Sequence, residues 1–224
     1  REAIVVEAES RVMKRVAGEV VSGFFETLHR SRGVDIRLGA RLASIEGDGR
    51  ATGVALASGE RIPAEVVLVA TGARANDDLA AAAGLPCEDG IVVDNFARAA
   101  PDVYAIGDCA LFFSHRFGRK IRLECVQNAV DQAKSAADAI LGKPKAYDPV
   151  PWFWSDQYEI KLQITGLLDG FDACETVGNP ADGKFSVEYR KAGKLIAVDA
   201  INDGRAHMLG RRRIAADLLE IGAA

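Results

Sequence analysis

The order of the first three predicted elements constrains this chain most. The β-branched run AIVVEA, residues 3–8, precedes a segment with apolar side chains at helical spacing, residues 17–32, and a second apolar run, VDIRLG, residues 34–39. A strand, a helix and a second strand in this order are typical of a βαβ unit, whose strands are parallel. The opening of the chain therefore predicts an α/β fold with a parallel sheet.

Three β-type segments follow: ARLASIEGDG (40–49), ATGVALASG (51–59) and EVVLVATG (65–72). The turns between them, GDGR and SGER, are short, polar and contain glycine, as β-hairpins require. We therefore expect a β-meander beside the parallel sheet, with EVVLVATG as its third strand.

The runs GIVVDN (90–95) and VYAIGD (103–108) predict two more strands, the second of them parallel to its neighbours, before a helix at about 126–141. The lysine-proline pair after Gly142 ends that helix. Its apolar face is predicted to consist of Val126, Ala129, Val130, Ala133, Ala137 and Ile140.

The composition changes at AYDPVPWFWSDQ, residues 146–157, which is rich in proline and aromatic residues and predicts a linker into a separate unit. That unit is expected to be a small α+β domain with an antiparallel sheet, followed by a helix at about 206–220. Its strands are expected near residues 159–165, 173–178, 184–190 and 194–200.

Charge and hydropathy exclude several classes of function. The net charge of −4 and the lack of a concentrated basic stripe argue against a nucleic-acid partner. No apolar run reaches the roughly 18 residues that a membrane span needs. The charged opening REAIVVEAES lacks the apolar stretch of a signal peptide, which predicts a cytoplasmic protein.

The sequence offers no metal site and no disulfide framework. Three histidines are too far apart for a metal motif, and four cysteines lack CxxC spacing. We expect reduced, mostly buried thiols. These residues are His29, His115 and His207, and Cys87, Cys109, Cys125 and Cys174.

Asp108 draws attention because it ends the predicted strand VYAIGD. In α/β folds, ligands bind outside the carboxyl ends of the strands, where Gly107 would let the backbone approach a ligand and a carboxylate could accept from ligand hydroxyls. Aspartate is also a common turn residue, so the Gly-Asp pair alone does not distinguish the two roles.

Five segments together resemble the flavin-dependent ferredoxin reductases of oxygenase systems. They are VATGARAN, GIVVDN, VYAIGDCA, LECVQNAVDQAKSAADAILGK and PWFWSDQYEIKLQITGL, and PWFWSDQ is the most specific part. The resemblance covers nearly the whole chain. It implies a flavoprotein that carries FAD, takes a hydride from NADH and passes single electrons to a small [2Fe-2S] ferredoxin that feeds an oxygenase.

The resemblance also implies roles for individual residues. Asp108 matches the aspartate that binds the ribityl chain of FAD, although Ala99 and Ala100 replace a Thr-Ser pair that often precedes this strand. The start of the helix near Val126 would face the pyrimidine side of the flavin, where its dipole favours negative charge. The chemistry takes place on the flavin, so no side chain is expected to be catalytic. The implied FAD contacts are Thr71, Gly72, Gly107, Asp108, Glu124, Val126 and Trp154.

Glu7 ends the strand IVVEA, where an acid in dinucleotide folds accepts from the adenosine ribose and repels a 2′-phosphate. The resemblance therefore favours NADH, although a nearby guanidinium from Arg11 could accommodate a phosphate. Trp154 could also lie beside the flavin near the docking face of the acceptor, whereas Trp152 is expected to fill a domain interface.

Two basic segments, HRFGRKIR and MLGRRRIA, could steer an acidic ferredoxin. The first is the stronger candidate and the second, Arg211–Arg213, the weaker one. The first contributes Arg116, Arg119, Lys120 and Arg122.

No G-x-G-x-x-G motif follows a strand, so both phosphate-binding loops of the family are missing from this sequence. Residues 1–73 then resemble the later part of an NAD-binding domain, 74–147 the closing part of an FAD-binding domain, and 148–224 the C-terminal interface domain. We expect these residues alone to be inactive, and uncovered apolar surface to favour pairing between copies.

Two alternatives stay open. One is a related flavoenzyme of the same two-dinucleotide fold, such as an NADH oxidase or a disulfide reductase, although this sequence supplies no redox cysteine pair. The other is an inactive fragment that acts only as an interaction module.

Overall fold

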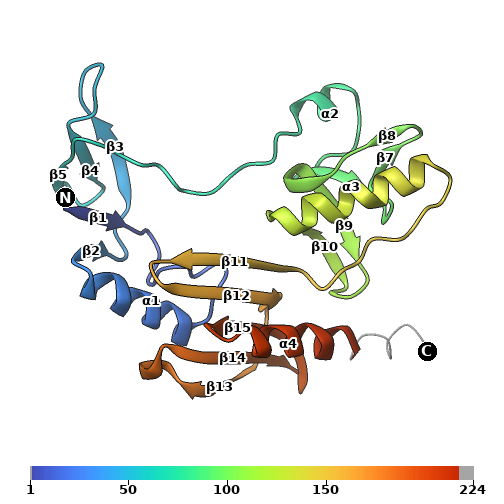
Figure 1. The fold of residues 1–224 in the computed structure, drawn as a ribbon. Helices are drawn as coiled ribbons and strands as arrows, with labels where there is room; N and C mark the ends of the chain where they lie inside the picture. The colour runs from blue at the N-terminus through green and yellow to red at the C-terminus, as the bar shows by residue number, and fades with distance from the viewer. Residues whose placement is uncertain (1, 217–224) are drawn as a thin grey trace. The chain divides into compact units, whose positions relative to one another are not determined.

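The computed structural model describes residues 2–216 and divides the chain into two compact units, Arg1–Gly72 and Ala73–Ala224 (Figure 1). We call them the N-terminal unit and the C-terminal unit. Among the described residues, no helix is long and apolar enough to cross a membrane.

The N-terminal unit begins with the predicted βαβ arrangement. Strand β1 (Ala3–Val6) pairs in parallel with β2 (Val34–Arg37), and the connecting helix α1 (Glu19–Ser31) buries Val21 and Phe25. These two side chains lie four residues apart, so they share one face of the helix. The periodicity of the sequence therefore predicted this unit's parallel pair correctly.

A three-stranded antiparallel meander follows, in the order β3 (Leu42–Glu46), β4 (Gly53–Leu56) and β5 (Arg61–Pro63). The meander is confirmed, but its third strand is β5, and the predicted strand at residues 65–72 is wrong. Val66 and Leu68 are 82% and 88% exposed, and no described strand pairs with this segment. A β-branched run needs a neighbouring strand to satisfy its backbone groups, so side-chain preference alone does not make it a strand.

The first part of the C-terminal unit holds a small mixed sheet. Its strand order is β10-β9-β6, with β6 parallel and β10 antiparallel to β9. A separate hairpin pairs β7 with β8. The elements are α2 (Asp78–Ala82), β6 (Ile91–Val93), β7 (Arg98–Ala100), β8 (Val103–Tyr104), the 3₁₀ turn η1 (Gly107–Cys109), β9 (Ala110–Ser114), β10 (Arg119–Arg122) and α3 (Val126–Ile140).

The VYAIGD segment differs from its prediction. Only Val103 and Tyr104 are β-structure, and they pair antiparallel with β7, whereas the segment was predicted to be a parallel strand. The turn at Asp102, whose φ is 60°, folds the chain back on β7 and thereby sets the antiparallel direction. The parallel strand in this part of the chain is β9, which begins just after Cys109.

Helix α3 lies where it was predicted, but its buried face was predicted wrongly. Val126, Val130 and Ile140 are exposed, whereas Asn128 and Gln132 are buried. The two amides bond to main-chain atoms outside the helix, and these hydrogen bonds set which face of α3 is turned inward.

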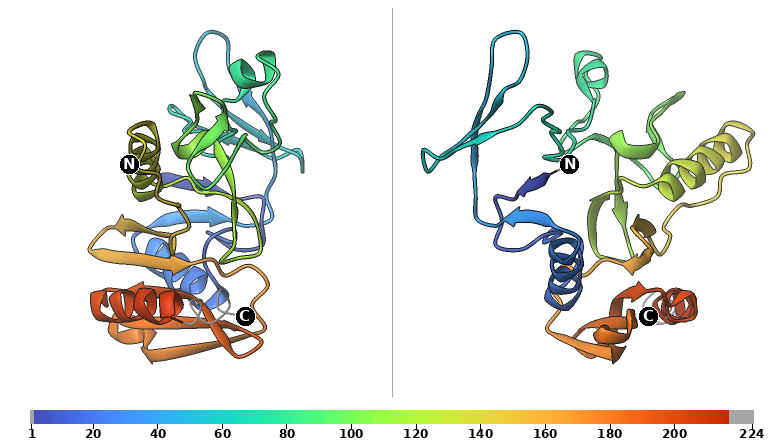
Figure 2. Two further views of the ribbon diagram at one scale, coloured as in Figure 1. Left: turned by 90° about the vertical axis from the view of Figure 1, so that its right-hand side faces the viewer. Right: turned by 60° about the vertical axis from the view of Figure 1, so that its left-hand side comes forward.

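The rest of the C-terminal unit is a five-stranded antiparallel sheet in the order β11-β12-β15-β14-β13, with helix α4 lying along it (Figures 1 and 2). Ile214 of α4 packs against Leu195 and Val198 of the sheet. The elements are β11 (Trp152–Gln157), β12 (Ile160–Gly166), β13 (Ala173–Asn179), the 3₁₀ turn η2 (Pro180–Asp182), β14 (Lys184–Lys191), β15 (Lys194–Ile201) and α4 (Gly204–Ala216).

The predicted α+β domain with an antiparallel sheet is confirmed, and one of its strands was missed. Residues 152–157 were assigned to a linker because of their aromatic and proline-rich surroundings, yet they form the edge strand β11. Residues 217–220 of the predicted last helix lie outside the described residues.

Candidate functional site

The turn at Gly107–Cys109 presents one carboxylate to solvent. Gly107 is buried and has a φ of 75°, a left-handed conformation that glycine adopts without strain. Its N–H donates to Oε1 of Gln132 on α3 at 2.7 Å. Asp108 is exposed, and its main-chain oxygen accepts from Nη1 of Arg122 at 2.9 Å. The backbone of the turn is therefore held from two sides while the side chain of Asp108 stays accessible.

The N-terminus of α3 lies beside this turn. Its N-cap residue, Cys125, makes no side-chain capping hydrogen bond, and Val126 is 64% exposed. Burial raises the pKa of the Cys125 thiol, and the nearby charge of Asp108 adds to the rise. An exposed carboxylate and the uncapped N–H groups of a helix therefore lie close together, which suits a ligand that carries both hydroxyls and a partial negative charge.

Glu124, predicted as a flavin contact, is engaged within the protein. Its Oε1 accepts from Nη1 of Arg122 at 2.7 Å, and Nη2 of Arg122 lies 3.2 Å from Asp89. Both side chains of the Arg122–Glu124 pair are mostly buried. This pair braces the end of β10 next to the Asp108 turn.

An aromatic cluster joins β11 to α4. The rings of Trp152 and Trp154 lie on one side of the strand, with centroids 5.7 Å apart, which confirms their predicted geometry. The guanidinium of Arg211 lies 5.2 Å from the centroid of the Trp152 ring, and the ring of His207 lies 5.4 Å from it. Trp154 remains 43% exposed at the outer end of the cluster.

A small cavity lies between the start of α3 and this cluster. Asn128 and Tyr147 line it on one side, and Trp152 and Arg211 on the other. Cavity and cluster thus lie next to the exposed N-terminus of α3. The other lining residues are Leu123, Cys125, Gln127, Asp131, Pro149, Val150 and Pro151.

Glu7 follows β1 in the N-terminal unit, at the carboxyl end of a parallel strand as predicted. Its carboxylate accepts from the N–H of Glu9 at 2.8 Å. Arg11 donates to the oxygen of Ala17 and to Oγ of Ser22, both at 2.6 Å, so its guanidinium is used to fix the loop before α1. The possible phosphate-accommodating role of Arg11 is therefore not favoured.

Thr71 and Gly72 are exposed and lie in irregular chain at the end of the N-terminal unit. Asp108 belongs to the C-terminal unit. That these residues meet at one flavin site stays a prediction, as do the roles of all the predicted site residues.

The predicted basic docking cluster is largely neutralised by neighbouring acids. Arg119 pairs with Asp169 at 2.8 Å, Lys120 with Glu88, and Arg122 with Glu124 and Asp89. The side chain of Arg116 points to the main-chain oxygen of Asp148 at 3.4 Å. Their use in docking stays a prediction.

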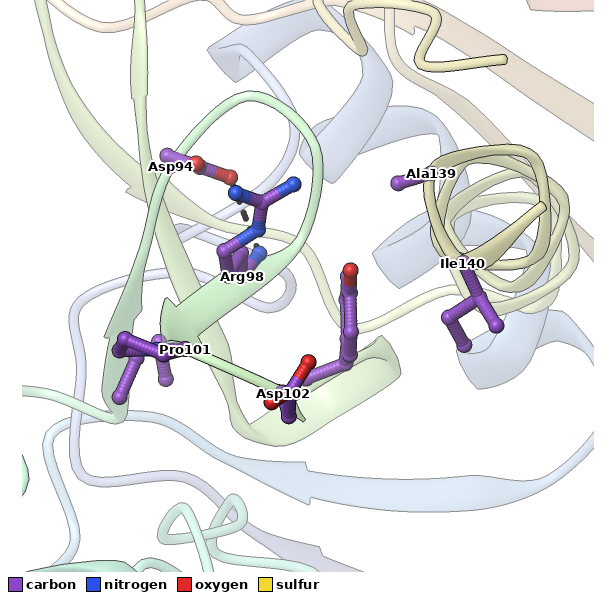
Figure 3. A pocket seen from close by; sticks show the side chains of 9 residues that line it. Asp94, Arg98, Pro101, Asp102, Ala139 and Ile140 are labelled. Atoms are coloured by element: carbon purple, nitrogen blue, oxygen red, sulfur yellow. Dashed lines mark hydrogen bonds between the residues drawn. The ribbon is translucent and has the colours of Figure 1, made fainter. Parts of the chain in front are cut away.

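A wider hollow than this small cavity lies elsewhere in the C-terminal unit. About 840 Å³ opens between the β7–β8 hairpin and the C-terminal end of α3 (Figure 3). The 15 residues of α3 place this end roughly 20 Å from Val126. Figure 3 shows Asp94 and Arg98 on one wall and Ile140 on the other. None of the predicted FAD contacts lines this hollow.

The four cysteines form no disulfide, but the expectation of mostly buried thiols is wrong: Cys87, Cys109 and Cys125 are partly exposed, and Cys174 is exposed. The described residues contain no cluster of His, Cys, Asp and Glu that could hold a metal ion.

Sequence reasoning missed three residues behind the Gly107 turn, Asn128, Gln132 and Tyr147. Asn128 and Gln132 lie four residues apart in VQNAVDQ, so they share one helix face. Two amides at this spacing are a signal of a buried polar face. The apolar side chains on the opposite face obscured it.

Comparison with known proteins identifies what the chain is similar to. Residues 1–133 match the family model described as pyridine nucleotide-disulphide oxidoreductase, and residues 152–221 match one described as reductase C-terminal. The 5,5′-dehydrodivanillate O-demethylase ferredoxin reductase subunit of Sphingobium sp. is 44% identical over 216 residues, which are 94% of this chain and 52% of that protein. Rhodocoxin reductase of Rhodococcus erythropolis is 43% identical, over 96% of this chain and 51% of that protein.

Solved structures agree with these relatives. The covalent putidaredoxin reductase–putidaredoxin complex matches with a TM-score of 0.90 and 38% identity, over 94% of this chain and 52% of that chain. This chain therefore spans about half the length of the relatives that it matches.

Proposed function

This chain belongs to the pyridine nucleotide-disulphide oxidoreductase family. From that membership we propose that the protein takes electrons from NADH and passes them through FAD to a small iron–sulfur ferredoxin, which serves an oxygenase. Two observations support the proposal: one relative is named as the ferredoxin reductase subunit of an O-demethylase, and one neighbouring structure is a complex with putidaredoxin. FAD, when bound, accepts a hydride and releases electrons one at a time. The protein's part is to bind and orient it.

The observation that carries the proposal is the exposed Asp108 carboxylate beside the uncapped start of α3. We assign Asp108 to the ribityl hydroxyls of FAD, because a carboxylate only accepts hydrogen bonds and its backbone is already held by Arg122. The N–H groups near Val126 would face the pyrimidine edge of the flavin, where a helix N-terminus stabilises negative charge by roughly 0.3–2 kcal/mol. Trp154 would lie at the exposed edge of the same site.

The proposed division of labour along the chain has three parts. Residues 1–73 contribute to NADH binding, 74–147 to FAD binding, and 148–224 to contact with the acceptor. The boundary between the compact units after Gly72 lies one residue from the first proposed boundary. The matched C-terminal family model, which begins at residue 152, supports the second.

The ferredoxin surface is better supplied by α4 than by residues 116–122. Helix α4 has four arginines and no acidic residue, and Arg205 and Arg212 make no ion pair with any carboxylate of the described chain. They flank Met208, which is 49% exposed. An acidic partner would find both unpaired cations and apolar area there. Arg119 and Lys120 would first have to leave their own acidic partners.

Asp108→Ala in the complete natural protein tests the flavin site. We expect the dissociation constant of FAD to rise about tenfold or more, because a charge-assisted hydrogen bond is lost. FAD binding to the apoprotein is measured by quenching of flavin fluorescence. Asp138→Ala, near the other end of α3, is the control, and FAD affinity equal to wild type in Asp108→Ala would exclude the proposed ribityl contact.

Electron transfer tests the function as a whole. NADH-driven reduction of cytochrome c should depend on an added [2Fe-2S] ferredoxin, and it should slow between 0.1 M and 1 M salt as the Debye length falls from about 10 Å to about 3 Å. Flavin reduction by NADH should change much less. Equal salt dependence of the two steps would argue against electrostatic docking, and turnover that ignores ferredoxin would contradict the proposed acceptor.

Glu7 is proposed to select NADH over NADPH. Glu7→Gln removes the charge that would repel a 2′-phosphate. The ratio of kcat/KM for NADH to kcat/KM for NADPH should therefore fall by roughly three- to tenfold. Glu9→Gln is the control, because Glu9 is paired with Lys14 at 2.6 Å. If the ratio is unchanged in Glu7→Gln, the assignment of Glu7 is wrong.

A further inference from the structure

Three buried side chains form a continuous hydrogen-bond network behind the Gly107 turn. Oε1 of Gln132 accepts from the N–H of Gly107 at 2.7 Å and lies 3.3 Å from Nδ2 of Asn128. Nδ2 of Asn128 donates to the main-chain oxygen of Leu123 at 2.9 Å. Oδ1 of Asn128 accepts from the hydroxyl of Tyr147 at 2.7 Å. The network thus runs from the turn, across α3, to the segment that follows the helix.

The network is shielded from water. Asn128 and Gln132 are 2% and 1% exposed, and Tyr147 is 8% exposed. Burial raises the pKa of the Tyr147 hydroxyl, which therefore stays protonated as a donor. Removing one partner from such a network leaves a buried polar atom unsatisfied, and this costs more than the average hydrogen bond contributes.

Tyr147 is itself fixed by main-chain contacts. The main-chain N–H of Tyr147 donates to the main-chain oxygen of Asn95 at 2.7 Å, and the main-chain oxygen of Tyr147 accepts from Nδ2 of Asn95 at 3.0 Å. Its ring packs on Phe112 of β9, with centroids 5.2 Å apart. The far end of the network is therefore anchored in the β6–β9–β10 sheet and its core.

We propose that Gln132, Asn128 and Tyr147 are positioning residues for the flavin site. The network fixes the left-handed backbone of Gly107 and so sets where the next residue, Asp108, directs its carboxylate. This inference rests on the proposed function, in which Asp108 binds the ribityl chain of FAD. None of the three side chains needs to touch the flavin.

The proposal explains why α3 turns its amide-bearing face inward and not the apolar face that the sequence predicted. Turning the apolar side inward would bury Val126 and Val130 but would remove both amides from the turn. Instead Val126 is 64% and Val130 43% exposed. The face of α3 that meets the turn is therefore the face that carries the two amides, both of which contact Gly107.

Gln132→Met in the complete natural protein tests the proposal, because methionine keeps the length of the side chain and removes the acceptor for Gly107. We expect the dissociation constant of FAD to rise about tenfold and the absorption maxima of the bound flavin to shift. Tyr147→Phe should raise the dissociation constant less, because it removes a bond two steps from the turn. Both constants are measured well below the melting temperature of each variant.

Two controls separate positioning from stability. Val187→Ala removes volume from the antiparallel sheet, where Val187 of β14 is fully buried and outside the core that anchors Tyr147, so it should lower the melting temperature but leave the FAD dissociation constant within about twofold of wild type. Lys134→Met introduces the same side chain on the exposed side of α3 and should change neither quantity.

The outcomes distinguish the two proposals. Gln132→Met with wild-type FAD affinity and spectrum, or with a change only in melting temperature like that of Val187→Ala, overturns the positioning role. Asp108→Ala with wild-type FAD affinity overturns the ribityl assignment. Gln132→Met could weaken FAD binding while Asp108→Ala leaves it unchanged. The network would then position the main chain of the turn for contact with FAD, and the assigned role of the Asp108 side chain would be wrong.

Discussion

In the β11–β15 sheet with α4, residues 152–216, the largest fully buried side chains are aromatic or aliphatic, among them Phe185, Leu162, Ile201 and Ile214. In the segment around the Gly107 turn, residues 90–147, the fully buried side chains include the amides Asn128 and Gln132. We call these the sheet region and the turn region. The sheet region is stabilised by apolar packing between its layers, whereas in the turn region side-chain amides hold the main chain of a loop.

The sheet region also buries polar atoms, but it uses them differently. The hydroxyl of Tyr189 donates to Oδ2 of Asp199 at 2.7 Å, and both residues lie in the paired strands β14 and β15. This contact joins strands that main-chain hydrogen bonds already join. In the turn region, by contrast, the amides are bonded to a loop that has no sheet partner. The Tyr189–Asp199 hydrogen bond therefore reinforces a strand pairing that already exists, whereas the amides of the turn region fix the backbone conformation of the Gly107 turn.

Glycine substitutions give the largest predicted difference. Gly166→Ala in β12 should cost about 4 kcal/mol or more, because φ is 78° and the new Cβ would lie 2.0 Å from the oxygen of Ile196. Gly107→Ala should cost only about 1–2 kcal/mol for the left-handed backbone, since its Cβ would meet Ala129 at 3.6 Å. Urea denaturation followed by tryptophan fluorescence measures both, and equal losses would show that the turn region is packed as tightly as the sheet region.

Truncation of apolar side chains tests the comparison next. Ile214→Ala should lower the free energy of unfolding by about 3 kcal/mol, because Ile214 is fully buried between α4 and the sheet. Val130→Ala on α3 should change it by less than about 0.5 kcal/mol, because Val130 is 43% exposed. The same denaturation experiment applies. A loss of similar size at Val130 would mean that the apolar side of α3 is covered in solution.

The comparison also explains what the sequence could predict. Val21 and Phe25 of α1 follow the helical period, and the βαβ opening was predicted correctly from it. The sheet region was predicted except for β11, whose aromatic residues resembled a linker. In both places the apolar side chains are the buried ones. There, the pattern of apolar residues is sufficient to predict the helices and strands, because the pattern indicates which side chains are buried.

The same reasoning failed where apolar side chains are exposed. Val130 suggested the wrong face of α3, and Leu68 suggested a strand that has no described neighbour. Asp108 could be identified as a candidate from the glycine-aspartate pair at the end of its segment. Gln132 and Tyr147 could not be assigned to the turn, since the contacts to Gly107 and Asn128 span 25 and 19 residues of sequence.

The smallest predicted effect concerns His207, a buried polar residue of the sheet region whose Nδ1 has no hydrogen-bond partner among the described residues. Burial lowers the pKa of His207, and the charge of Arg211 lowers it further. As the pH falls, the unfolded chain, with a histidine pKa of about 6.5, therefore binds a proton at a higher pH than the folded protein does. The contribution to stability is fully present above about pH 6.5 and is lost as the pH falls from there toward the lowered pKa of the folded state.

His207→Phe should remove this dependence, because phenylalanine keeps a ring against Trp152 without a titrating group. The measurement is the free energy of unfolding from urea denaturation between pH 8 and pH 5.5, for wild type and variant. We expect the wild-type value to decrease more steeply toward acid than that of the variant. Parallel profiles would mean that the pKa of His207 is the same in the folded and unfolded states, so that burial in the sheet region does not change its protonation.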